Sequence, residues 1–193
     1  MAAFYTALLG SMIVSNSVLA GYKGLCSYLG ISKKSSSAFG MGVALTFVCV
    51  LSGLISWGLG FALRAIGIYD FMSTIVFILV ISSLVQLTEL IIKKFFPSLY
   101  KTLGIYLPLI TTNCVVLGLA LQAGGMSDPA SFLEVLGTVL GVPLGYFIVI
   151  MIFSCIQERL ETSNTTYNFK GAAIGLITTA IMALAVYGFS GVI

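Results

Sequence analysis

Six stretches of mostly apolar residues, separated by short polar connections, make up most of the chain. Each is long enough to cross a bilayer, which takes about 20 consecutive apolar residues in a helix. The stretches are apolar on nearly all sides rather than on one face, as expected of helices buried in lipid and against each other. We therefore predict an all-α membrane protein, with six transmembrane helices in a single integral membrane domain over residues 1–193. The spans are 3–29, 38–66, 71–92, 103–122, 132–156 and 169–193.

The composition excludes an ordinary soluble protein. Hydrophobic residues make up 59% of the chain, charged residues make up 8%, and the mean hydropathy is +1.13. A soluble domain carries about 25% charged residues, because its surface has to be hydrated. The net charge of +3 comes from basic residues spread over several connections. We therefore expect no nucleic-acid partner.

The basic residues predict how the chain is oriented in the membrane. Eight of the nine lie in or near the first, third and fifth connections, and only Arg64 falls on the other side. Positively charged connections stay in the cytoplasm, which places these three inside and both termini outside. No Lys or Arg precedes residue 22, so the first stretch is a retained span rather than a signal peptide. The eight are Lys23, which we expect to reach the same side, Lys33, Lys34, Lys93, Lys94, Lys101, Arg159 and Lys170.

A short motif occurs once in each half of the chain. Residues 26–30 and 114–118 both read Cys-x-x-Leu-Gly, in the first span of residues 1–95 and in the first span of residues 96–193. Glycine pairs in 40–42 and 137–141 echo each other more weakly. Three spans per half would invert the second half, as in membrane proteins built from two inverted repeats. The alternative is a chance match between apolar segments.

Both motif-bearing spans contain residues that interrupt helices. Span 1 has Ser15-Asn16-Ser17 and a glycine on each side of Tyr22-Lys23, and span 4 has Pro108 followed by 111–113, Thr-Thr-Asn. Proline removes a backbone donor, and nearby hydroxyl and amide groups can bond the freed backbone in a membrane. We therefore predict broken helices in spans 1 and 4, each with a cysteine near the break. Pro143 predicts a kink in span 5.

The four cysteines divide into two pairs. No two stand at Cys-x-x-Cys spacing, so no self-contained metal site is visible, and a disulfide would need two of them within about 7 Å. We interpret Cys49 and Cys155, which lack polar neighbours, as small buried apolar residues. Cys26 and Cys114 lie in equivalent contexts beside the breaks. They could supply half of the four ligands of an iron–sulfur cluster, with the rest from a second chain, or they could simply pack.

A few polar residues inside the predicted spans are further candidates. Glu89 could be a stop for a proton or cation on its way through the membrane, or it could pair with Lys93 one turn later. Asn16 and Asn113 could cap half-helices or bond the sulfurs of a cluster. Lys23 could stabilise a negatively charged cluster or extend to the interface. The chain has no His, which excludes haem or Rieske-type ligation through histidine, and it has no nucleotide-binding fingerprint.

These residues resemble the signature of the RnfA/NqrE family over essentially the whole chain, and overall similarity favours the Rnf side. The resemblance departs at Ser15-Asn16, where many relatives carry two Asn. The matching segments are 107–118, Lys23 to Cys26 with Gly30 and 33–34, 77–80 with Gln86 and Glu89, and 157–161.

The resemblance implies a six-span subunit of a redox-driven ion pump in the bacterial cytoplasmic membrane. Rnf complexes pass electrons from reduced ferredoxin to NAD and export Na+ or H+, whereas Nqr complexes pass them from NADH to quinone. It further implies a homologous partner of opposite orientation, which is RnfE-like in Rnf complexes. The two would share a [2Fe–2S] cluster that relays electrons across the membrane, with Cys26 and Cys114 as this chain's ligands. No catalytic residues are expected in this chain alone.

Two other functions also fit the pattern. A secondary transporter with a substrate site near the bilayer midplane would have the same broken spans and inverted halves. A structural membrane protein without a cofactor is the other, although it would need neither broken spans nor inverted halves. The paired cysteines favour the electron-carrying role, because a transporter needs no thiols on its symmetry axis.

Overall fold

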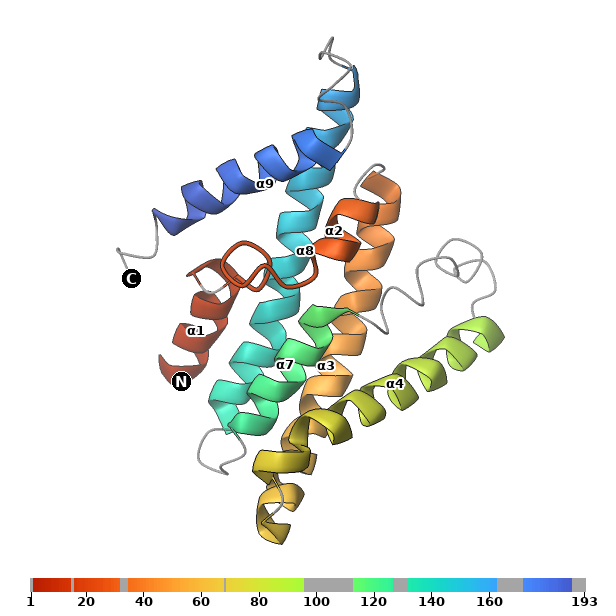
Figure 1. The fold of residues 1–193 in the computed structure, drawn as a ribbon, viewed down its shortest axis with the longest axis vertical. Helices are drawn as coiled ribbons and strands as arrows, with labels where there is room; N and C mark the ends of the chain where they lie inside the picture. The colour runs from red at the N-terminus through yellow and green to blue at the C-terminus, as the bar shows by residue number, and fades with distance from the viewer. Residues whose placement is uncertain are drawn as a thin grey trace.

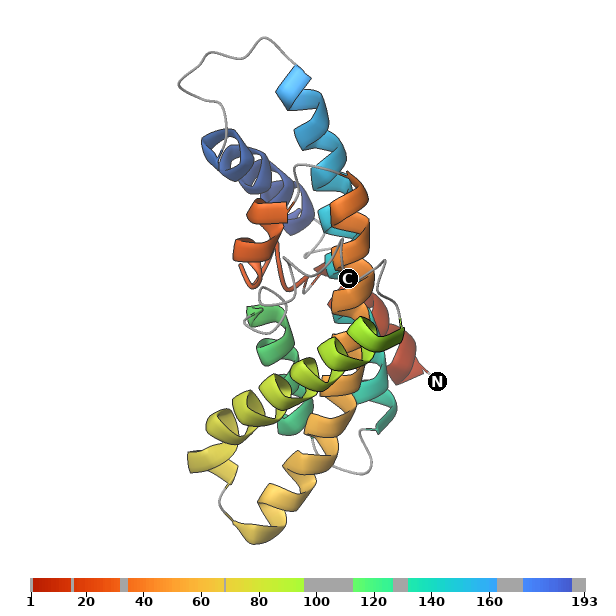
Figure 2. The same cartoon turned by 90° about the vertical axis from the view of Figure 1, so that its right-hand side faces the viewer.

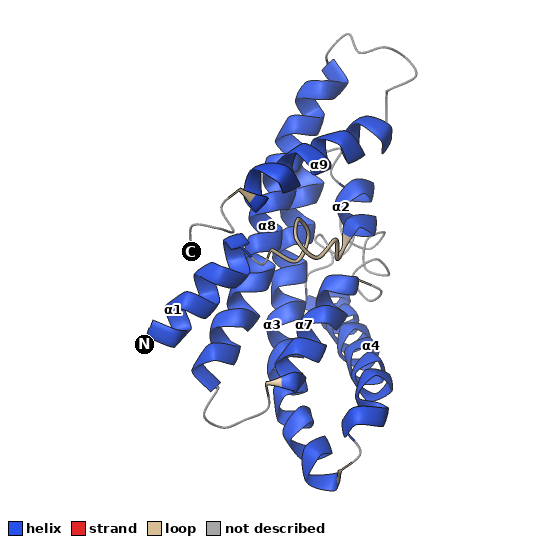
Figure 3. Cartoon of the chain, turned by 60° about the vertical axis from the view of Figure 1, so that its left-hand side comes forward, coloured by secondary structure: helices blue, strands red, loops and turns tan. Residues whose placement is uncertain are grey.

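The described part of the structure consists of helices joined by turns (Figure 1). This computed structural model describes residues 2–14, 16–31, 35–67, 69–95, 113–126, 132–162 and 172–188. No strand occurs in these ranges (Figure 3), which confirms the all-α prediction for them. The elements are α1 (Ala2–Leu9), the π-helical turn η1 (Gly10–Val14), α2 (Leu25–Ile31), α3 (Ser35–Ile66), α4 (Tyr69–Phe95), α7 (Cys114–Gly125), α8 (Phe132–Thr162) and α9 (Ala172–Tyr187).

Two of the described helices are long and apolar enough to cross a membrane. They are Ser35–Ala65 in α3, with a mean hydropathy of 2.2, and Phe132–Leu160 in α8, with a mean hydropathy of 2.4. The other predicted spans contain shorter apolar helical segments, at Phe4–Ile13, Met72–Leu87, Cys114–Gly125 and Ala173–Tyr187. Six full spans therefore stay a prediction.

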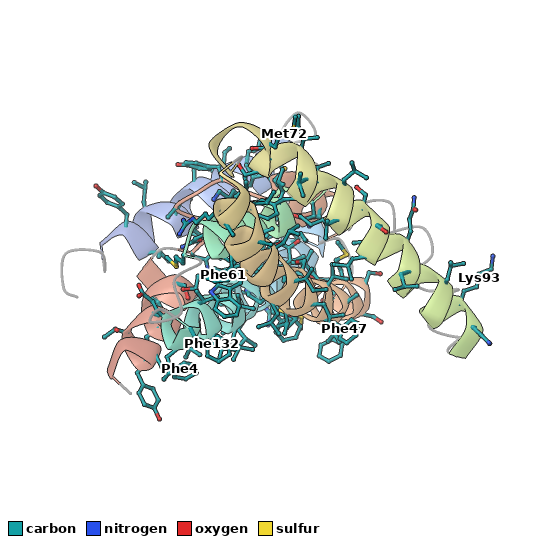
Figure 4. The ribbon with its side chains drawn as sticks, turned by 90° about the horizontal axis from the view of Figure 1, so that it is seen from below. Phe4, Phe47, Phe61, Met72, Lys93 and Phe132 are labelled. Carbon is teal, nitrogen blue, oxygen red and sulfur yellow. The ribbon has the colours of Figure 1, made fainter. Side chains whose placement is uncertain are left out.

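Helices α3 and α8 form the centre of the molecule. Helix α3 packs against α7, α8 and the start of α4, and α8 packs against α1, η1 and α3. Helix α4 then extends away from the other described helices (Figure 1), and Lys93 lies at its far end (Figure 4). The same end view shows Phe47 at the outside of the bundle, where it is 55% exposed (Figure 4). Exposed apolar side chains of this kind are what lipid contact requires.

Close backbone packing holds α1 and η1 against α8. Gly137, Gly141 and Gly145 recur every four residues, so they share one face of α8. A Cβ atom on any of them would lie 2.7–2.8 Å from a carbonyl oxygen of α1 or η1. Lipid tails are as apolar as the helices, so association in a membrane depends on such close approach of small residues rather than on hydrophobic burial. From the sequence, these glycines are marked only by the weak echo between 137–141 and 40–42.

The break predicted in span 1 is present. The helical run α1–η1 ends at Val14, α2 begins at Leu25, and turns connect them from Ser17 to Gly24. Tyr22 and Gly24 take positive φ values of 52° and 81°, a backbone region that helices do not use. In span 4, α7 begins at Cys114, and Pro108 with the other residues of 96–112 lies outside the described residues. Pro143 lies within α8, which continues past it as one helix.

Candidate functional site

The first component of the site is the start of α7. Asn113 has an extended backbone with φ −73° and ψ 119°, and its side-chain Oδ1 accepts a hydrogen bond of 3.0 Å from the Val115 N–H. This is the geometry of a helix N-cap, which typically stabilises a helix by about 1 kcal/mol. Asn113 is 1% exposed. The cap makes Cys114 the first residue of α7, where its side chain is exposed.

The second component is the start of α2, which follows Gly24. The carbonyl of Gly24 accepts bonds from the Tyr28 N–H at 3.0 Å and from the Ser27 hydroxyl at 2.9 Å. Gly24 also packs closely against the start of α7. A Cβ atom on it would lie 2.6 Å from Cγ2 of Val115 and 3.1 Å from Oδ1 of Asn113. Cys26, the second residue of α2, is exposed.

A buried chain of polar side chains joins these two helix starts to α8. Nδ2 of Asn113 donates to Oγ of Ser27 at 2.9 Å, and Oγ of Ser27 lies 2.9 Å from the hydroxyl oxygen of Tyr146. A serine hydroxyl has one hydrogen and two acceptor lone pairs. Since Ser27 gives its hydrogen to Gly24, we assign Tyr146 as the donor to Ser27. Ser27 and Tyr146 are 0% exposed, and in lipid such a bond has no competing water.

These linked hydrogen bonds, which we call the half-helix junction, connect the segments that carry the two motif cysteines. Cys26 is next to Ser27 and Cys114 is next to Asn113, and those neighbours share the hydrogen bond. In Figures 1 and 2 the N-terminal end of α7 lies directly below α2. Among the described residues, no group of three or more His, Cys, Asp and Glu could hold a metal ion. The described part of the junction therefore offers two exposed thiols and no further ligand of these types.

The other two cysteines take no part in the hydrogen bonds of the junction. All four cysteines are described and free, so no disulfide joins them. Cys49 is fully buried, as predicted. The prediction that Cys155 is buried is wrong, because it is exposed on α8 and lines an apolar groove with Ile152 and Ile156. In a membrane protein an apolar residue has no need of burial, since lipid accepts it as readily as the core does.

Asn16 forms hydrogen bonds with the backbone at the beginning of the span 1 break, where η1 ends. Its Nδ2 donates to the Met12 carbonyl at 3.0 Å, and its Oδ1 accepts from the Val18 N–H at 3.0 Å. The side chain thereby satisfies backbone groups that the end of η1 leaves free. Glu89 belongs to α4 by its backbone, but its side chain lies outside the described residues, so its role stays a prediction.

Lys23 does not point where we predicted. We expected it to extend toward the side of Lys33. Its side chain instead lies against Gly118 of α7, one turn beyond Cys114 and away from the end of α2 that leads to Lys33. A cavity of about 290 Å³ adjoins it, between the span 1 break and α7.

Sequence reasoning missed Ser27 and Tyr146. Ser27 follows a candidate ligand directly, and this was the one available signal for it. Tyr146 lies in an apolar stretch without any marker, 119 residues from Ser27.

A family profile described as "Rnf-Nqr subunit, membrane protein" matches residues 4–193. The chain belongs to the Rnf-Nqr family. Within this Rnf-Nqr chain the match includes both half-helices and both cysteines of the junction. It also identifies the protein as a membrane protein, which two apolar helices alone would support only weakly.

The chain is similar over nearly its whole length to the A subunits of ion-translocating complexes. It is 45% identical over 184 residues to the A subunit of the Na(+)-translocating ferredoxin:NAD(+) oxidoreductase complex of Acetobacterium woodii, covering 95% of each chain. It is 41% identical over 194 residues to the A subunit of the ion-translocating oxidoreductase complex of Aliivibrio salmonicida, covering 100% of this chain and 99% of the relative. The corresponding protein of Pseudomonas paraeruginosa is 43% identical over 187 residues, 96% of this chain and 95% of its own length. This confirms the resemblance found from the motifs.

Proposed function

We propose that this Rnf-Nqr chain is a membrane subunit of an Rnf-type complex that couples electron transfer from ferredoxin to NAD to the export of Na+ or H+. In this proposal Cys26 and Cys114 are two of the four ligands of a [2Fe–2S] cluster inside the membrane. Two cysteines of a homologous, oppositely oriented subunit complete the set. The observation that carries the proposal is the half-helix junction, in which the residues next to the two exposed cysteines, Ser27 and Asn113, share a buried hydrogen bond.

The residues at the junction fit such a group. Thiolates are the usual ligands of iron–sulfur clusters, and four are needed. Both thiols are exposed, so a second chain can reach them. The start of α7 adds the partial positive charge of a helix N-terminus, which favours a negatively charged group beside Cys114.

The chain's own part is to hold two ligands in a fixed relation. A cluster bound there would supply a one-electron carrier in the bilayer interior. Asn113 fixes the start of α7, Ser27 links it to α2, and Tyr146 ties both to α8. Ligands held by packed and hydrogen-bonded neighbours keep their geometry and tune the properties of what they bind.

The packing supports two inverted repeats of three spans each. The second helix of the first half, α3, packs against the half-helix α7 of the second half. The second helix of the second half, α8, packs against α1 and η1 of the first half. A two-fold axis between the halves would exchange α3 with α8 and span 1 with span 4, so that the second helix of each half packs against the first span of the other. We propose this architecture in the bacterial inner membrane, surrounded by lipid and the other Rnf subunits.

Labelling would test the proposed orientation. A cysteine placed at Lys34 is expected to react with a membrane-impermeant thiol reagent only from the cytoplasmic side, and one placed at Gly67 only from the outside. The unsubstituted chain, labelled in parallel, accounts for its four native cysteines. Labelling at position 34 only from outside would contradict the orientation.

Iron analysis tests the cofactor directly. We expect this chain, purified with its homologous partner and no other protein, to contain about two iron atoms per pair and to give an electron paramagnetic resonance signal after dithionite reduction. The same pair before reduction is the control and should be silent. An intact pair without iron would contradict the proposal and would favour a transporter or a structural protein. The alternative electron-carrying role is that of an Nqr-type subunit. The names of the relatives favour the Rnf-type role.

A further inference from the structure

Lys23 occupies an unusual position inside the broken span. It lies between Tyr22 and Gly24, which both have positive φ. Its own N–H donates to the Ser17 carbonyl at 2.8 Å, so the backbone is held in place. A non-glycine residue in the left-handed region is strained, and such strain persists only where the surrounding structure imposes it. The break thus holds Lys23 in a defined direction.

Gly118 provides the space for the lysine side chain. A Cβ atom at Gly118 would lie 2.9 Å from Cδ of Lys23, 3.0 Å from its Nζ and 3.2 Å from its Cε. The equivalent glycine of the first motif, Gly30, has nothing within 4 Å. Packing against Lys23 therefore accounts for the glycine at position 118, whereas no such contact accounts for Gly30.

This arrangement brings a positive charge near Cys114. Residues four apart on a helix are neighbours on one face, with Cβ atoms about 5–6 Å apart. Gly118 is four residues after Cys114, and the Lys23 ammonium lies against it. The ammonium is therefore about one helical turn from the position of that thiol.

Among the described residues, polar groups but no carboxylates line the cavity beside the ammonium. The adjoining cavity is lined by Ser11, Ser17 and Gln122 among others, and no carboxylate is among its described lining residues. Oγ of Ser17 is buried without a hydrogen-bond partner. A charged side chain inside a membrane is costly unless it is paired or faces a polar cavity. The exposed Lys23 side chain thus adjoins a partly polar cavity whose described lining contains no carboxylate.

We propose that Lys23 supplies the positive counter-charge for the group held by Cys26 and Cys114. The absence of a side chain at Gly118 leaves the space that the lysine needs to reach this position. The inference rests on the proposed function. Reduction adds one negative charge to a cluster ligated by thiolates, so a fixed positive charge nearby stabilises the reduced state more than the oxidised state. Lys23 therefore raises the reduction potential of the site.

A redox titration of the purified complex tests this role. With Lys23→Met, which keeps the length of the side chain and removes its charge, we expect the midpoint potential of the intramembrane [2Fe–2S] signal to become more negative. Lys23→Arg keeps the charge and should stay close to the unsubstituted complex. Lys94→Met, which removes the same charge at the far end of α4, should leave the potential unchanged.

Gly118→Ala provides a second and independent variant. This variant keeps Lys23 but fills the space that the lysine side chain occupies. The ammonium must therefore move away, and the midpoint potential should shift in the same negative direction by a smaller amount. An unchanged potential in Lys23→Met or, where that variant does not assemble, in Gly118→Ala overturns this inference and leaves the proposed function intact. A complex that lacks the signal before any substitution overturns both.

Discussion

Replacing Cys26 or Cys114 with alanine is expected to abolish the reducible iron–sulfur signal of the subunit pair and the ferredoxin-to-NAD activity of the complex. Either substitution leaves three thiolates where four are needed. The described residues offer no other group of His, Cys, Asp and Glu that could replace the lost ligand, and water is scarce at this depth in a bilayer. The measurements are iron content, electron paramagnetic resonance after dithionite reduction, and electron transfer by the whole complex.

The remaining cysteines provide matched controls. Cys49→Ala removes a small buried side chain at a cost of about 1 kcal/mol, and Cys155→Ala changes an exposed position. Both variants should keep the iron, the signal and the activity. A fully populated cluster in the Cys26→Ala, Cys114→Ala double variant would refute the ligand assignment.

Gly24→Ala is expected to destabilise the half-helix junction more than any other exchange of glycine for alanine near the cysteines. Its φ of 81° would cost an L-residue about 1–2 kcal/mol. The added methyl group would also lie 2.6 Å from Cγ2 of Val115, and overpacking of this kind costs about 1–3 kcal/mol. We therefore expect a lower thermal stability of the subunit pair in detergent and a reduced iron content.

Gly30→Ala is the control, in the same span and six residues later. Gly30 lies within α2, and a Cβ atom there would meet nothing within 4 Å. Alanine is favoured over glycine in a helix by up to about 1 kcal/mol, so stability should be unchanged or slightly raised. Equal stability of the Gly24→Ala and Gly30→Ala variants would show that the close approach at Gly24 does not hold the half-helices together.

Local features of the chain were predictable because they depend on local chemistry. The helical class follows from long runs that are apolar on every side. The break in span 1 follows from Ser, Asn and Gly inside such a run, because these residues bond or free the backbone where they stand. The two cysteines could be singled out because a motif repeats around them, and Asn113 because amide side chains commonly cap helices.

The sequence by itself thus determined a helical membrane protein of the Rnf-Nqr family, with one of its two motif cysteines just after a helix break in span 1. Only the tertiary structure decided what surrounds those cysteines. The bonds of Ser27 to Asn113 and to Tyr146 span 86 and 119 residues, and no local pattern predicts contacts over such separations. Hydropathy also did not predict which way the side chains of Cys155 and Lys23 face. In a bilayer, lipid-facing and core-facing surfaces are equally apolar, so the side that a residue faces is set by packing between helices and not by its polarity.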